Sequence, residues 1–109
     1  MIEEINESDF ETLLNTEKMI IADFYSKWCG PCKMMVPILE ELSQKYQNIT
    51  FVKIEADKYA ELSEKFQIST LPTFLFITNN NVCRHLTGFI PKEKFEKEII
   101  GLIESFGPK

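Results

Sequence analysis

Two cysteines, Cys29 and Cys32, stand three residues apart in the segment Trp28-Cys-Gly-Pro-Cys32. This spacing is short enough for a disulfide, so the pair can open and close with little movement of the backbone. The thiolate is the reactive form of cysteine, and the positive end of a helix dipole with its free N–H groups stabilises it. If a helix begins at this segment, the pair is suited to reversible dithiol–disulfide chemistry.

Two plainer interpretations of the pair stay open: half of a zinc site, or two inert buried thiols. The third cysteine, Cys83, and the only histidine, His85, could complete a four-ligand set with the pair. Structural zinc usually takes its second ligand pair from a turn, whereas these two residues alternate on an expected strand. The pattern therefore favours redox chemistry, and we expect no metal site. Three cysteines are also too few for a disulfide scaffold.

The elements that must position the pair alternate along the chain. A nearly continuous apolar run at 19–25 predicts a strand buried on both faces, as in a parallel sheet, and a segment rich in β-branched and aromatic residues at 49–56 predicts the next strand. Apolar residues at steps of three and four predict helices at about 8–16, from 32 onward, at 57–67 and from 91 onward, the first opened by the capping box Ser8-Asp-Phe-Glu11. Segments 73–78 and 82–87, joined by three asparagines, predict a hairpin. We expect an α/β fold with a mixed sheet and a single domain over 1–109.

Composition excludes several function classes. The chain has 109 residues, with 12 basic and 17 acidic side chains and a net charge of −5, and no basic stripe that would suit nucleic acid. No apolar run approaches the roughly 20 residues of a membrane span, and the amino terminus is acidic where a signal peptide would be basic. We therefore expect a cytoplasmic protein that binds neither nucleic acid nor a membrane.

With Asp23 in the strand before Trp28-Cys-Gly-Pro-Cys32, Lys53 in the next strand, Leu71-Pro72-Thr73 before the hairpin and Gly88 after it, the chain closely resembles the thioredoxin family. The match spans essentially the whole chain and is more specific than a bare C-x-x-C. The resemblance implies a three-layer fold in which helices cover both faces of a mixed central sheet. Departures are modest: Tyr25 stands where many relatives have Trp, Asn80 replaces a turn glycine, and Cys83 lies outside the motif.

The resemblance also implies the chemistry. The family reduces protein disulfides: Cys29 as thiolate attacks the target disulfide, and Cys32 resolves the mixed disulfide. Because Asp23 lies within an apolar run, we expect it to be buried beneath the pair, with its pKa raised by desolvation, and to exchange protons with Cys32. The resemblance makes Lys53 the nearby counter-charge. It also reverses the general preference for trans and predicts a cis Leu71–Pro72 bond that packs against the pair.

Partners follow from the same resemblance. The chain has no G-x-G-x-x-G loop for a nucleotide, so we expect no bound cofactor and electrons from NADPH through a separate thioredoxin reductase. Targets would be disulfide-containing proteins, and we expect a monomer. The implied target-binding residues are Trp28, Gly30, Pro31, Leu71, Pro72, Thr87, Gly88 and Phe89.

Alternative functions remain open for the whole chain, and alternative roles for Cys83, the cysteine outside the motif. A redox-inert binding module could use the same fold, while a disulfide isomerase or oxidase is disfavoured by the Gly30-Pro31 pair, which resembles the reducing members. We expect Cys83 to share a strand face with His85 and Thr87, opposite Val82, Arg84 and Leu86. It is expected to be a spectator in catalysis. The competing hypothesis, an intermolecular disulfide or a glutathione cap at Cys83, requires exposure.

Overall fold

The computed structural model describes residues 2–16 and 18–106. In chain order its elements are β1 (Glu3–Glu4), α1 (Glu7–Leu14), β2 (Met19–Tyr25), α2 (Gly30–Lys45), β3 (Ile49–Glu55), the 3₁₀ helix η1 (Ala56–Lys58), α3 (Ala60–Lys65), β4 (Thr73–Thr78), β5 (Asn81–Thr87) and α4 (Lys92–Phe106). No helix in this described part of the chain is long and apolar enough to cross a membrane.

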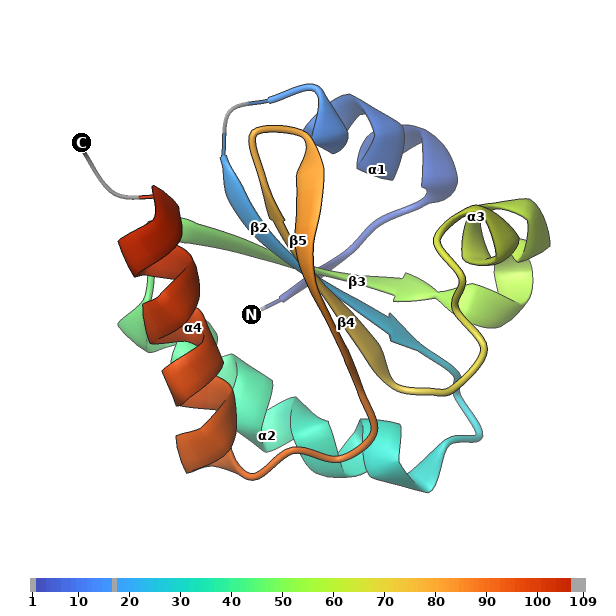
Figure 1. The fold of residues 1–109 in the computed structure, drawn as a ribbon. Coiled ribbons are helices and arrows are strands. Elements are labelled where there is room, and N and C mark those ends of the chain that lie inside the picture. The colour runs from blue at the N-terminus through green and yellow to red at the C-terminus, as the bar shows by residue number, and fades with distance from the viewer. Residues whose placement is uncertain (1, 17, 107–109) are drawn as a thin grey trace.

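One sheet runs through the molecule in the order β1-β3-β2-β4-β5. Strand β3 pairs in parallel with β1 and β2, whereas β4 runs antiparallel to both β2 and β5. The expected mixed sheet is therefore confirmed, with β2 at its centre and the hairpin at one side (Figure 1). Because β2 has neighbours on both edges and helices over both faces, its sequence is nearly all apolar.

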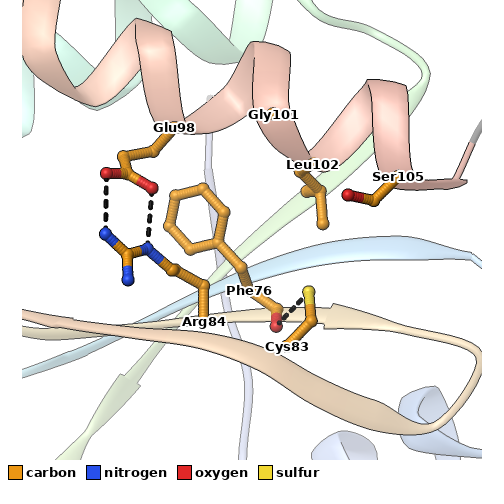
Figure 2. Close-up of a pocket in the computed structure, with 7 residues that line it drawn as sticks. All are labelled: Phe76, Cys83, Arg84, Glu98, Gly101, Leu102 and Ser105. Carbon is orange, nitrogen blue, oxygen red and sulfur yellow. Dashed lines mark hydrogen bonds and ion pairs between the residues drawn. The ribbon is translucent and has the colours of Figure 1, made fainter.

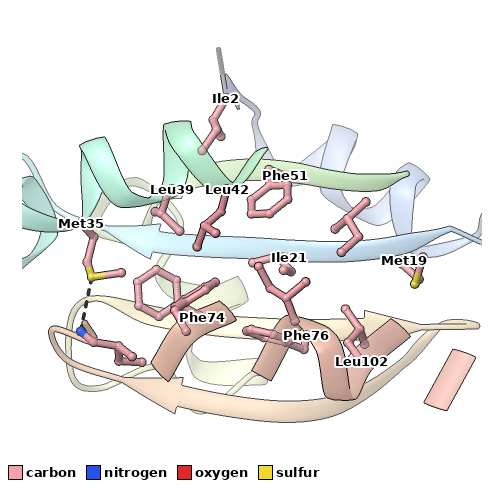
Figure 3. Close-up of a cluster of buried hydrophobic side chains, with 14 residues drawn as sticks. Ile2, Met19, Ile21, Met35, Leu39, Leu42, Phe51, Phe74, Phe76 and Leu102 are labelled. Atoms are coloured by element: carbon pink, nitrogen blue, oxygen red, sulfur yellow. Dashed lines mark hydrogen bonds between the residues drawn. The ribbon is translucent and has the colours of Figure 1, made fainter. Parts of the chain in front are cut away.

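Helices cover both faces of the sheet, as expected for three layers. On one face α2 and α4 pack against alternate strand residues, including Phe74 and Phe76, and their side chains meet in a single apolar layer (Figure 3). The ring of Phe95 on α4 lies edge-on to that of Phe74, with 5.0 Å between the ring centroids. On the other face α1 and α3 cover a second cluster around Phe10 and Phe24.

Several element ends differ from the sequence-based expectations. The N-cap of α1 is Asn6, whose side-chain oxygen accepts the N–H of Asp9 at 2.7 Å, so the predicted capping box at Ser8 is wrong. Asn6 and Ser8 both precede the same apolar stripe and could both cap a helix. The chain leaves β1 with extended backbone at Asn6, so the helix begins at the next residue. The helix expected at 57–67 is divided into η1 and α3. The last helix begins at Lys92, one residue after Pro91.

The hairpin turn matches the expectation, because Asn79 and Asn80 both adopt positive φ, at 49° and 69°. The face assignment on β5 is wrong, however. Phe76 pairs with Arg84 and Ile77 with Val82, so Cys83 is an extra residue in a β-bulge. The bulge breaks the alternation and turns Cys83 toward α4 with Arg84, as Figure 2 shows.

Candidate active site

The two cysteines lie where β2 passes into α2. Cys29 is the N-cap residue of α2, and Gly30 and Pro31 are its first helical residues. The backbone N–H of Cys32 donates to Cys29 Sγ at 3.2 Å, and the two cysteines form a disulfide across a Cα–Cα distance of 5.2 Å. Proline suits the first turn because it has no N–H that would lack a partner there. When the pair is reduced, this helix start supplies the dipole and the N–H donor that stabilise a Cys29 thiolate.

The sulfurs differ in accessibility. Cys29 is partly exposed, whereas Cys32 is only 4% exposed. A bulky partner sulfur therefore reaches Cys29 first, and Cys32 is placed to react from within. This asymmetry arises because the N-cap residue stands outside the helix, while Cys32 faces back toward the sheet.

Asp23 is buried in the middle of β2, as the sequence predicts, and is 7% exposed. Desolvation raises its pKa from 3.8 to about 7, and the positive charge of Lys53 partly opposes that rise. Asp23 and Lys53 are direct partners in the parallel β2–β3 register, so they lie on the same face of the sheet. Asp23 Oδ1 has no hydrogen-bond partner, and Asp23 and Cys32 line the same pocket.

The residues expected to bind targets meet at one end of the sheet. The Leu71–Pro72 bond is cis, which confirms that prediction. Gly88, at a φ of 83°, donates its backbone N–H to the carbonyl oxygen of Pro72 at 2.8 Å, so the loops before β4 and after β5 are adjacent. The register pairs Thr73 with both Phe24 and Thr87, and this brings both loops beside the end of β2 that leads into the cysteines.

These candidate binding residues are mostly accessible. Trp28 is 88% exposed and Phe89 is 42% exposed, so Trp28 does not fill the core. Leu71 and Gly88 are half-buried, Pro72 is buried, and Gly30, Pro31 and Thr87 are exposed. Trp28 and Phe89 thus add exposed apolar surface at the end of the sheet where the partly exposed Cys29 lies, and exposed apolar side chains suit the binding of an extended polypeptide.

Sequence reasoning missed several residues of this site. Ser26 is buried beside the cysteines; its hydroxyl donates to Asp57 Oδ2 at 2.9 Å and accepts the N–H of Trp28 at 3.3 Å. Two lysines, Lys27 and Lys33, line the pocket that holds Asp23 and Cys32. No local pattern distinguishes these residues from ordinary loop and helix positions, since the tertiary contacts alone assemble them.

The structure does not bring the proposed zinc ligands together. Cys83 lies beside the hairpin turn, at the end of β5 remote from Thr87, and the bulge puts it on the opposite face from His85. In the described part of the chain no group of three or more His, Cys, Asp or Glu residues could hold a metal ion. The zinc alternative built on these four residues is therefore wrong.

A cysteine pair at the first turn of a helix, on a mixed sheet with helices on both faces, defines a protein-disulfide oxidoreductase. Comparison with known proteins gives the family. The sequence model of the Thioredoxin family matches residues 1–101. Thioredoxin of Mycoplasmoides gallisepticum is 38% identical over 92 residues, which is 84% of this chain and 92% of the relative. Thioredoxin of Equus caballus is 36% identical over 106 residues, which is 94% of this chain and 100% of the relative.

A comparison with solved structures finds the same fold. Mitochondrial thioredoxin 3 of Saccharomyces cerevisiae, in its oxidized form, superposes with a TM-score of 0.83 at 31% identity, covering 92% of this chain and 94% of that one. The chain belongs to the thioredoxin family. As in that family, its Cys29–Cys32 pair forms the redox-active centre of a fold that acts on disulfide-containing targets.

Proposed function

We propose that the protein is a cytoplasmic, monomeric reductant of protein disulfides, re-reduced by an NADPH-dependent thioredoxin reductase and holding no cofactor of its own. The observation that carries the proposal is the placement of Cys29 as the N-cap of α2, with its sulfur accepting the N–H of Cys32. A sulfur in that position is stabilised as the thiolate and is also the more accessible of the two.

The first step is nucleophilic. The Cys29 thiolate attacks one sulfur of the target disulfide, a bond forms between Cys29 and that sulfur, and the target disulfide breaks. The second target sulfur leaves as a thiolate and takes a proton from water. Exposed apolar side chains, above all Trp28 and Phe89, would hold the target chain during this step.

The second step needs a proton acceptor because a thiol at the buried Cys32 must lose its proton before it can attack. Asp23 shares its pocket and has a pKa of about 7, so its carboxylate can take the thiol proton near neutral pH. The Cys32 thiolate then attacks Cys29, the bond between Cys29 and the target breaks, and the Cys29–Cys32 disulfide forms. The target sulfur leaves as a thiolate and takes a proton from water, while Asp23 returns its proton to the solvent. The target gains two electrons and two protons, and the reductase must return the same number to this chain. Lys53 would tune the proton affinity of Asp23.

Insulin reduction tests the proposal directly. Protein, insulin, NADPH and a thioredoxin reductase are mixed, and NADPH oxidation is followed with insulin precipitation. We expect both signals to require this chain and to vanish in Cys29→Ser, while Cys32→Ser accumulates a mixed disulfide on a non-reducing gel. If this chain speeds insulin reduction with dithiothreitol but not with the reductase, the proposed electron donor is wrong. If it speeds insulin reduction with neither reductant, a redox-inert binding module is favoured.

A further inference from the structure

Three lysines from three different parts of the fold converge on the pocket beside Cys32. Lys27 comes from the loop before α2, Lys33 from the first turn of α2, and Lys53 from β3. The pocket has a volume of about 260 Å³, and the side chains of Tyr25 and Val36 supply its apolar wall. A positive cluster at this place contrasts with a chain whose net charge is −5.

The three lysines take part in none of the ion pairs found among the described residues. Those pairs join Lys45 to Glu96, Lys58 to Glu55, Arg84 to Glu98 and Lys92 to Glu41. Lys53 instead lies over the ring of Tyr25, 5.8 Å from its centroid. Lys27 and Lys33 are exposed.

The acidic groups around the pocket are already engaged or partly protonated. On β1, Glu4 lies near Tyr25, and its interaction with that phenol adds to desolvation in raising the pKa of Tyr25. On β3, Glu55 pairs with Lys58, and in η1 Asp57 accepts from Ser26. Asp23 lines the pocket itself, and burial keeps about half of it protonated near pH 7. The pocket therefore keeps an excess of positive charge, which attracts a carboxylate.

Lys27 and Lys33 lie close to Cys29 in the sequence, so a target polypeptide held at Cys29 could supply the carboxylate. Lys27 lies two residues before Cys29, and Lys33 lies one helical turn after it, its N–H bonded to the carbonyl oxygen of Cys29 at 3.2 Å. One turn advances about 5.4 Å, and an extended polypeptide advances about 3.3 Å per residue. A side chain two or three residues from the attacked cysteine of a target therefore reaches these lysines.

We propose that Lys27 and Lys33 bind a carboxylate of the target polypeptide, so that the protein favours disulfides with Asp or Glu two or three residues from the attacked cysteine. This inference rests on the proposed disulfide reduction and adds a substrate preference to it. The apolar surface around Trp28 would hold any target, whereas the lysines discriminate among targets by charge. Because both lysines are exposed, the preference falls as salt screens it.

Three cyclic disulfide peptides test the preference. They are identical except for Glu, Gln or Lys at the positions two and three residues from each cysteine. The protein is reduced, separated from the reductant and mixed with each peptide. The amount of reduced peptide is measured over time after quenching with acid. At low salt we expect the rate constant for the Glu peptide to exceed that for the Lys peptide about tenfold, consistent with two exposed ion pairs. In 0.5 M salt the ratio should fall to about two or less.

The variant Lys27→Gln/Lys33→Gln should bring the low-salt ratio close to one. The ratio is the readout because a shared change in Cys29 reactivity cancels in it. A matched control, Lys18→Gln/Lys97→Gln, removes the same charge from exposed positions before β2 and on α4, and should keep the wild-type ratio. A wild-type ratio near one, or a preference that survives Lys27→Gln/Lys33→Gln, would overturn the inference. Failure to reduce even the Gln peptide would instead overturn the proposed function, and the preference with it.

Discussion

Asp23 couples the pH of the solution to the stability of the fold. Its pKa is about 7 in the folded chain, so between about pH 4 and 7 the folded state binds a proton that the unfolded state has released. Stability from this group is complete below about pH 4 and is lost as the pH rises through 7. The loss at full ionisation is about 4 kcal/mol, which follows from the difference between 3.8 and about 7.

The variant Asp23→Asn tests this linkage, because an amide has no proton to lose in this range. We expect the free energy of unfolding of the variant, relative to wild type, to rise by about 4 kcal/mol between pH 3 and pH 9. The measurement is urea denaturation of both oxidised proteins across that range. Parallel pH profiles for the two proteins would show that Asp23 is not a buried acid with a raised pKa.

The same variant addresses the proposed proton transfer. Without the carboxylate, Cys32 loses its acceptor, so we expect insulin reduction by Asp23→Asn to fall about tenfold or more near pH 7. The deficit should shrink at higher pH, where hydroxide removes the thiol proton. Wild-type rates across neutral pH would contradict the role of Asp23 in resolution.

At the scale of single elements, the start of α1 depends on one side chain. Asn6 caps the helix through its bond to the N–H of Asp9, whereas no such cap is formed by Ser8. We expect Asn6→Ala to lower the free energy of unfolding by about 1 kcal/mol and Ser8→Ala to change it by less than about 0.5 kcal/mol. Thermal or urea denaturation of the two variants measures these losses. A larger loss in Ser8→Ala than in Asn6→Ala would show that Ser8 caps the helix.

The bulge in β5 gives Cys83 its surroundings. The thiol is exposed, donates to the carbonyl oxygen of Phe76 at 3.2 Å and lies near Leu102 and Ser105 of α4 (Figure 2). The exposure that an intermolecular disulfide requires is therefore present, although the thiol lies at the far end of the hairpin from the active site.

Because of that separation, Cys83 stays a predicted spectator in catalysis. We expect Cys83→Ser to reduce insulin within about twofold of the wild-type rate. Treatment with peroxide, followed by non-reducing electrophoresis, tests the competing hypothesis. A wild-type dimer that is missing in Cys83→Ser would assign Cys83 a redox role and contradict the spectator prediction.

At the scale of the whole molecule, the layer between the sheet and α4 depends on Phe95. Its ring is fully buried and contacts the rings of Phe74 and Phe76 at centroid distances of 5.0 and 5.4 Å. We expect Phe95→Ala to cost about 3–5 kcal/mol of unfolding free energy. Phe89→Ala, which truncates a ring that is 42% exposed, should cost less than about 1 kcal/mol.

Urea denaturation measures the free energy of unfolding of both variants, and insulin kinetics test whether Phe89 contributes to target binding. If Phe89 serves target binding, Phe89→Ala should raise the KM for insulin more than it lowers kcat. Similar stability losses in the two variants would contradict the assignment of Phe95 to the core and Phe89 to the surface.

The sequence alone determined the features that depend on local chemistry. The cysteine spacing at an expected helix start indicated a dithiol site, and the apolar run around Asp23 predicted its burial, because a side chain within such a run faces the core on either side of the strand. The expected hairpin at 73–78 and 82–87 predicted that the sheet is mixed, and the three asparagines predicted its turn. The cis bond before Pro72 came from the family resemblance, since general preference favours trans.

The features that depend on register and on distant neighbours follow from the tertiary structure. Strict alternation predicted the wrong face for Cys83, because one extra residue in β5 shifts every side chain before it relative to the partner strand. Two side chains near the start of α1 could each cap a helix, and the path from β1 selected Asn6 over Ser8. No local pattern singles out Lys27 or Lys33, and the family resemblance gave Lys53 only the part of a counter-charge to Asp23. The packing of α2 on β2 and β3 brings the three charges to one pocket beside Cys32, where they can act together.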